Sequence, residues 1–141
     1  MKVVINVCFG GFGLSVEGEK LYAKKCGFEL FYYKQTKYKH NGGVDEYVRQ
    51  SNPQDLFVHS LKIDMGILFS TWTELVNKNY FSSRDIERTD LKLIEVVEEL
   101  GDLANGSCAK LKVVEIPNGI EWEIDEYDGN ERIAETHRTW G

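Results

Sequence analysis

A glycine-rich segment, Gly10-Gly11-Phe12-Gly13, follows the first apolar run and stands two residues before Ser15. Glycines let a backbone approach a ligand closely, and the N–H groups at a helix start attract anions. No Gly-Lys-Ser/Thr follows, and Val16 occupies the third glycine position of a dinucleotide fingerprint. The segment therefore predicts either a weak anion site containing Gly11 and Phe12 or a tight turn that exposes Phe12. We expect a positive φ within the glycine pair.

Lysines alternate with aromatic residues between Lys20 and Lys39. The stretch holds six lysines and six aromatic residues, and only Glu29 opposes them. Cations that meet phosphate beside rings that stack on bases suit nucleotides or single-stranded nucleic acid. Tyr32 and Tyr33 are the candidate stacking rings. The alternative is an amphipathic strand and helix with solvated lysines.

Three arginines are candidates for holding an anion. Arg84 and Arg88 precede a capped helix, and Arg138 lies in the tail. A guanidinium fork matches the oxygens of phosphate or carboxylate. Local salt bridges with neighbouring acidic residues are the alternative.

Titratable residues gather near the C-terminus, where Glu126, Asp128, Glu131 and His137 stand within twelve positions. A Glu–His pair can transfer protons, and two carboxylates can hold a divalent ion. The three histidines are far apart and have no metal-ligand spacing, so we predict no metal site and no catalytic residue. A structural network that ties the tail to a hairpin is the favoured interpretation.

Cys8, Cys26 and Cys108 are odd in number and lack C-x-x-C spacing. This pattern argues against a zinc knuckle and against a disulfide framework. We expect three reduced and mostly buried thiols.

The chain that must position these residues has 141 residues, which predicts one domain covering 1–141. Its 42% hydrophobic and 28% charged residues exclude a disordered tail. No apolar run approaches the roughly 20 residues that span a bilayer, and the first run lacks the charged region and cleavage site of a signal peptide. We therefore predict a cytoplasmic protein with no membrane partner.

Charge is unevenly spread along the chain. Residues 1–62 carry nine Lys/Arg against six Asp/Glu, whereas residues 63–141 carry eight against seventeen. The net charge of −6 opposes binding to a long nucleic acid. A small anionic ligand fits this balance better.

Apolar periodicity and turn residues predict strands interspersed with helices. Strands are expected at 3–9, 28–34, 56–61, 108–116 and 120–127, helices at 16–26 and 90–100, a helical turn at 44–50 and a short helix at 130–140. Ser15 and Asp90 are the expected N-caps, and Gly27 and Gly101 the expected stops. Residues 67–77 fit helix and strand patterns equally.

Pro117-Asn118-Gly119 separates two alternating segments, which predicts a hairpin of 108–116 with 120–127. Together the elements predict an α+β fold. We expect a mixed or largely antiparallel sheet, two or three helices and a C-terminal hairpin.

Two parts of the chain resemble a family of small proteins encoded by bacteriophages and prophages. The resemblance rests on Val4-Ile5-Asn6 and Cys8 to Ser15, on Arg88-Thr89-Asp90, Val97 to Gly101 and Leu111 to Pro117, and on Trp122-Glu123-Ile124, Glu126 to Gly129 and His137 to Trp140. It covers about residues 3–15 and 84–141, with Leu91 where that family favours proline. It implies a phage origin, host cytoplasm as the location and, by context, an anti-defence role, but no activity.

The leading hypothesis is a non-enzymatic protein that binds and sequesters a small, anionic, nucleotide-like immune signal. Gly11, Phe12, Tyr32, Tyr33, Arg84, Arg88 and Arg138 are its expected binding residues. No cofactor is expected, and we expect a homo-oligomer. The alternatives are an acidic protein-interaction inhibitor or phage accessory protein, supported by the acidic second half, and a small nucleotide hydrolase that uses the C-terminal carboxylates and His137.

Overall fold

The computed structural model describes residues 1–39, 43–53 and 58–136. The chain divides into two compact units. The first unit comprises residues 1–22 and 83–141, and the second comprises residues 23–82. The expectation of one domain over residues 1–141 stays a prediction.

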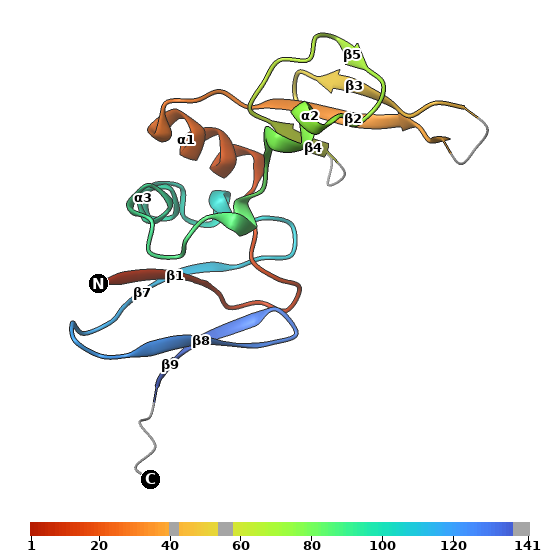
Figure 1. Cartoon of the computed structure of the whole chain (residues 1–141). Coiled ribbons are helices and arrows are strands. Elements are labelled where there is room, and N and C mark those ends of the chain that lie inside the picture. The colour runs from red at the N-terminus through yellow and green to blue at the C-terminus, as the bar shows by residue number, and fades with distance from the viewer. Residues whose placement is uncertain (40–42, 54–57, 137–141) are drawn as a thin grey trace. The chain divides into compact units, whose positions relative to one another are not determined.

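The first unit is built on a two-stranded antiparallel ladder of β1 (Lys2–Asn6) and β7 (Leu111–Glu115). A second antiparallel pair, β8 (Trp122–Tyr127) and β9 (Asn130–Glu135), forms a hairpin. Figure 1 shows α3 (Leu91–Leu100) on one side of the β1–β7 ladder and the hairpin on the other. The ladder is therefore covered on both faces.

Alternation along β1 supplies the core of the first unit. Val3 and Ile5 pack with Ile116 and with the apolar face of the hairpin, which comprises Trp122, Ile124 and Ile133. Val4, on the opposite face of the strand, is fully buried, as is Leu93 of α3. Burial of a valine or leucine side chain contributes about 1.5–3 kcal/mol.

The two long helices are those that the sequence predicts. Helix α1 spans Val16–Cys26, and the Ser15 hydroxyl accepts a hydrogen bond from the Gly18 N–H as its N-terminal cap. The Asp90 carboxylate accepts from the N–H groups of Lys92 and Leu93 at the start of α3. Gly27 and Gly101 follow the two helices at φ +86° and +57°.

The second unit contains a five-stranded antiparallel sheet in the order β5-β3-β2-β4-β6. Its strands are β2 (Phe31–Lys37), β3 (Glu46–Gln50), β4 (Val58–Leu61), β5 (Leu68–Phe69) and β6 (Tyr80–Phe81). A short helix, α2 (Glu74–Lys78), adds Val76 to the core of this sheet. Two 3-10 turns, η2 (Ser83–Asp85) and η3 (Gly101–Ala104), belong to the first unit.

The α+β class, the largely antiparallel sheets and the C-terminal hairpin are confirmed, but several elements are corrected. Leu111–Glu115 pairs with β1 rather than with β8, and the hairpin turns at Asp128-Gly129. The predicted helix at 130–140 is wrong in its described part, because Asn130–Glu135 is strand β9. The predicted helical turn at 44–50 is also wrong, since Glu46–Gln50 is strand β3.

The ambiguous segment 67–77 contains both a short strand, Leu68–Phe69, and part of α2. All three cysteines are free, but Cys26 and Cys108 are exposed, so the expectation of mostly buried thiols is wrong. No helix within the described ranges is long and apolar enough to cross a membrane.

Candidate functional site

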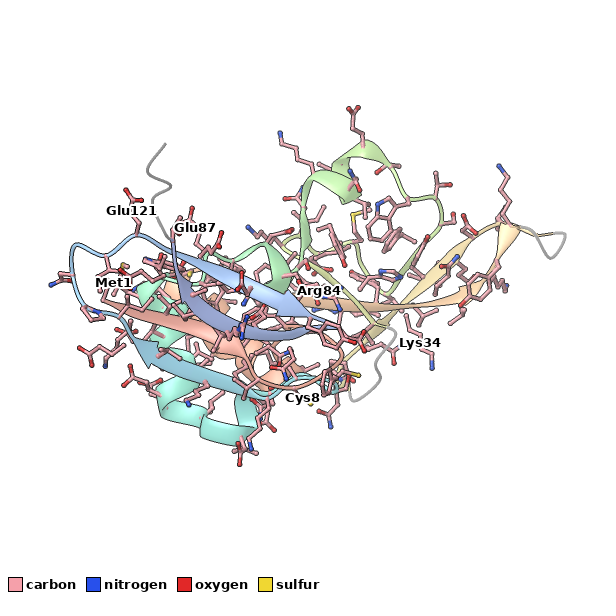
Figure 2. All side chains as sticks on the ribbon, turned by 90° about the horizontal axis from the view of Figure 1, so that it is seen from below. Met1, Cys8, Lys34, Arg84, Glu87 and Glu121 are labelled. Carbon is pink, nitrogen blue, oxygen red and sulfur yellow. The ribbon has the colours of Figure 1, made fainter. Side chains whose placement is uncertain are left out.

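A cleft of about 390 Å³ opens in the first unit, where three distant segments meet. We call it the hairpin cleft; it is lined by Gly10, Gly11, Phe12, Arg84, Arg88, Glu126, Asp128, Gly129 and Glu131. Figure 2 places Arg84 beside the end of the hairpin strands, on the side that also carries Cys8 and away from Met1 and Glu121. Four of the seven predicted binding residues, Gly11, Phe12, Arg84 and Arg88, therefore line one cleft.

The glycine pair forms the floor of the hairpin cleft by packing backbone against backbone. Gly10 and Gly11 have φ of +119° and +106°, which confirms the expected positive φ. The Gly10 N–H donates to the Asp128 carbonyl at 3.1 Å. A Cβ added to Gly129 would overlap the Gly11 nitrogen. The hairpin turn therefore packs directly against the backbone of Gly10 and Gly11. This turn has positive φ at both Asp128 and Gly129, which matches a type I′ turn.

Two backbone donors that follow the glycine segment are used within the protein. The Leu14 N–H donates to the Ser83 hydroxyl, and the Ser15 N–H donates to the Ala104 carbonyl. Ser15 caps α1. The N–H groups of Gly10, Leu14 and Ser15 are therefore already bonded within the protein.

An ion pair forms one wall of the hairpin cleft. Arg88 donates to both carboxylate oxygens of Glu131, at 2.6 and 3.0 Å, and Glu131 is only 7% exposed. The same carboxylate accepts from the Asn6 N–H at 2.8 Å, on the edge of β1 that faces away from β7. The Val4 N–H on that edge donates to the Arg88 carbonyl. Glu131 thus belongs to a structural network, but this network joins the hairpin to β1 and Arg88 rather than to the tail, and it protects an open strand edge. The expected network between the tail and the hairpin stays a prediction.

Phe12 lies beneath the guanidinium of Arg88, whose central carbon is 3.6 Å from the ring centroid. The ring is 4% exposed, so the turn does not expose Phe12 as one alternative predicted. A cation over an aromatic face is held by the ring quadrupole. Arg88 is thereby held between Phe12 and Glu131, so its guanidinium forms part of the cleft wall and does not extend into solvent.

Arg84 enters the hairpin cleft from η2. One of its terminal nitrogens would lie 3.8 Å from a Cβ on Gly11, so the guanidinium stands over the glycine floor. Together the lining side chains supply two guanidiniums and three carboxylates. Arg88 and Glu131 neutralise each other. The other charged side chains of the lining are those of Arg84, Glu126 and Asp128. Within the described part of the chain, no three potential metal ligands stand together.

Tyr32 and Tyr33 belong to the second unit, in the interior of its sheet. They are 2% and 0% exposed. The Tyr33 hydroxyl donates to the Gly66 carbonyl and accepts from the Met65 N–H, and burial raises the pKa of Tyr33. Rings this deeply buried offer no face to a ligand, so we do not carry them into the proposed site.

An exposed aromatic pair lies beside the hairpin cleft, and the sequence did not lead us to expect it. Phe9 and Tyr127 are 58% and 79% exposed, and their rings meet edge to face at 6.4 Å. Tyr127 lies between Glu126 and Asp128, but strand alternation directs it to the opposite face of the hairpin from Glu126. The sequence signal that could have indicated this pair is the position of each aromatic residue directly before a turn, Phe9 before Gly10 and Tyr127 before Asp128.

Comparison with known proteins gives no match to a family model, to a curated protein or to a solved structure. The resemblance to phage proteins therefore stays a prediction. Arg138 and His137 lie outside the described residues. Of the predicted site, the structure assembles Gly11, Phe12, Arg84 and Arg88.

Proposed function

We propose that this protein is a non-enzymatic binding protein that holds a small, nucleotide-like ligand in the hairpin cleft. In a phage-infected cell it would act by sequestering an immune signal. The observation that carries the proposal is the meeting of Arg84, Arg88 and the glycine segment in one cleft of about 390 Å³. A cleft of this volume is within the range that small molecules occupy.

Each part of the hairpin cleft has a distinct role in this proposal. Arg84 contacts the anionic group of the ligand through charge-assisted hydrogen bonds. Arg88 and Phe12 hold the wall in place. The carboxylates of Glu126 and Asp128 accept hydrogen bonds from hydroxyl or amino groups, because an ionised carboxylate has no donor to offer.

Calorimetric titration tests the proposal. Purified protein is titrated with nucleoside monophosphates, ADP-ribose and its cyclic forms, and cyclic oligonucleotides. Arg84→Ala is expected to weaken binding at least tenfold, since one charge-assisted contact contributes about 1.5–3 kcal/mol. The matched control is Arg132→Ala, because Arg132 is in the same unit, has a side chain that is 81% exposed and does not line the hairpin cleft.

A second variant distinguishes an effect of the glycine floor on ligand affinity from an effect on stability. Gly11→Ala would place a methyl group 3.8 Å from the Arg84 guanidinium, at ordinary contact distance, but at a φ of +106°. Gly119→Ala has a similar φ cost, at +83°, with nothing within 4 Å. We expect both variants to lose similar stability and only Gly11→Ala to lose affinity. No binding of any member of the panel at micromolar protein would refute the proposed function.

An acidic interaction module is the second candidate. The first unit holds nine Lys/Arg against seventeen Asp/Glu, a balance of −8. Its hairpin exposes Glu121, Glu123 and Glu126. Such a surface attracts a basic partner. One stoichiometric, salt-sensitive protein partner captured from host lysate, together with no nucleotide binding, would favour this candidate.

A further inference from the structure

We infer that β7 is the surface through which two copies of this chain associate, by antiparallel pairing of β7 with β7. The inference goes beyond the proposed function, because no residue of β7 lines the hairpin cleft. It gives the expected homo-oligomer a defined interface. The directions of the backbone groups along the β1–β7 ladder, the exposure of β7 and the order of its charges carry the inference.

The ladder has an outer edge on each strand, and the edge of β1 is closed by other parts of the first unit. The Val4 N–H donates to the Arg88 carbonyl at 2.8 Å, and the Asn6 N–H donates to the Glu131 carboxylate at 2.8 Å. Both N–H groups point away from β7. Unpaired backbone groups on a strand edge are a surface for pairing with another chain, and these bonds remove them from β1. A further strand could therefore add to this ladder only along β7.

The outer edge of β7 carries backbone groups that point away from the ladder. Val113 is the ladder partner of Val4, whose N–H points outward, so the two form a non-hydrogen-bonded pair and the N–H and C=O of Val113 also point outward. Alternation along the strand directs those of Leu111 and Glu115 the same way. The Leu111 N–H already donates to the Asn105 side chain at 2.8 Å. Within the described residues, the N–H groups of Val113 and Glu115 have no such acceptor.

The exposure of β7 agrees with an uncovered edge. Val3 and Val4 of β1 are fully buried, whereas their ladder partners Val114 and Val113 are only partly buried. A second strand along β7 would cover the apolar surface that these two valines leave in water. Such burial favours association.

The hydrogen-bonding pattern of this edge matches a second copy of itself. In an antiparallel pair with its two-fold axis at Val114, Val113 of each copy stands opposite Glu115 of the other. The outward N–H and C=O groups of these two residues then all find partners. Leu111, whose N–H is already bonded, stands opposite Pro117, which has no N–H. The two positions that lack an open donor thus face each other.

The order of charges along β7 favours the same occupant. Lys110 and Lys112 at its start and Glu115 at its end are exposed, and within the described residues none of the three belongs to an ion pair. Antiparallel pairing brings Glu115 of each copy close to Lys112 of the other, within the screening length of about 8–10 Å. A second copy of β7 therefore complements the strand at both of its ends.

Sedimentation velocity of the full chain tests the inference. Pairing of one short strand buries less than the roughly 1,200–2,000 Å² of a stable interface, so we expect a reversible dimer with a micromolar dissociation constant. Val113→Pro removes an outward N–H that makes no ladder bond to β1. This variant should weaken the dimer about tenfold or more, because it deletes a donor from each copy and leaves the opposite carbonyls unpaired. Its far-UV circular dichroism should match that of the wild type.

Oxidative cross-linking locates the interface. The background carries Cys26→Ser and Cys108→Ser, because these two thiols are exposed. The two copies of Val114 face each other across the axis with Cα atoms about 4.5 Å apart, so Val114→Cys should give a disulfide-linked dimer. Lys112→Cys is the matched control, since it lies on the same face of β7 but its two copies stand on opposite sides of the axis, too far apart for a disulfide.

The expected result is a dimer that Val113→Pro weakens and that Val114→Cys, but not Lys112→Cys, cross-links. A wild-type chain that stays monomeric up to roughly millimolar protein would overturn the inference. A dimer that Val113→Pro leaves intact, or equal cross-linking by the two cysteine variants, would also overturn it. If Val113→Pro fails to fold, the two cysteine variants decide alone. Nucleotide binding is measured separately, so failure of this inference leaves the proposed function standing.

Discussion

The two units use charged and aromatic residues in opposite ways. In the first unit, seventeen acidic residues meet nine basic ones, and the buried pair of Arg88 with Glu131 helps to build a cleft. In the second unit, with eight basic and six acidic residues, the aromatic rings pack against one another. Tyr47 and Phe69 stack at 4.8 Å, and Trp72 lies 5.4 Å from Tyr47. Aromatic residues of the second unit thus form its core, whereas charged residues of the first unit line a candidate site.

Removing one partner of the Arg88–Glu131 pair should have the largest effect on stability. Arg88→Ala leaves Glu131, which is 7% exposed, as a buried charge, and such truncations cost about 3–5 kcal/mol. The double variant Arg88→Leu with Glu131→Leu should cost less than the sum of the two single changes. The free energy of unfolding from urea titration measures the difference.

The second unit contains an exposed ion pair that can be compared with the Arg88–Glu131 pair. Arg49 and Asp64 lie 3.0 Å apart, with side chains that are 38% and 51% exposed. Their exposure predicts no measurable loss for Arg49→Ala beyond its packing over the Phe31 ring. A loss as large as that of Arg88→Ala would remove the contrast between the two units.

Gly129→Ala should have the next largest effect. The added Cβ would overlap the Gly11 backbone, at a φ of +87°. We expect a loss of about 2–4 kcal/mol, which combines left-handed strain with displacement of the glycine floor. Gly119→Ala, at φ +83° in open space, measures the strain alone, about 1–2 kcal/mol. Equal losses in the two variants would mean that the turn does not need its close packing.

Much of the fold could be predicted because its signals are local. Ser15 and Asp90 cap their helices, and Gly27 and Gly101 end them. Strand pairing was harder. Pro117-Asn118-Gly119 looked like a hairpin turn, but Leu111–Glu115 finds its partner in β1, far away in the sequence. The true turn, Asp128-Gly129, carries an equally strong Asp-Gly signal that we did not use.

The candidate site could be predicted only in part, for the same reason. The types of Gly11, Phe12, Arg84 and Arg88 marked them one by one, but nothing local in the sequence indicates that Glu131 pairs with Arg88. Tyr32 and Tyr33 show the converse difficulty. An aromatic run beside lysines is typical of both a stacking surface and a buried strand, and only the tertiary packing of the second unit decides between them.

Tyr33→Phe tests whether the second unit depends on its few buried polar contacts. The variant loses the bonds of the hydroxyl to Gly66 and Met65, at 2.9 and 2.8 Å. The expected cost is about 1–2 kcal/mol, because the Met65 N–H loses its acceptor. Tyr127→Phe is the control, since Tyr127 is 79% exposed in the first unit. A thermal melt of the two variants should separate them by several degrees, and coincident melts would contradict the prediction.

The smallest expected effect is the pH dependence contributed by His59. Burial among the rings of Tyr47, Trp72 and Tyr80 lowers the pKa of His59 below its ordinary value. The unfolded chain then takes up the proton first, so stability is complete above the unfolded pKa of about 6.5 and declines as pH falls toward the folded pKa. Stability is measured for wild type and His59→Gln at several values between pH 8 and pH 5, and the other titrating groups cancel in the difference.

The difference between wild type and His59→Gln should shift against the wild type as pH falls. Two forces compete at this site. Desolvation opposes the charged imidazole, whereas the faces of Tyr47 and Trp72 attract a cation. Because the imidazole is half-buried, with its ring centroid 5.2 Å from that of Trp72 and 5.8 Å from that of Tyr47, we expect desolvation to outweigh the attraction. If the wild type instead gains stability relative to His59→Gln on acidification, the rings of the second unit act as a cation site rather than as a core. Both units would then use their side chains to bind a charged group, and the difference between them would disappear.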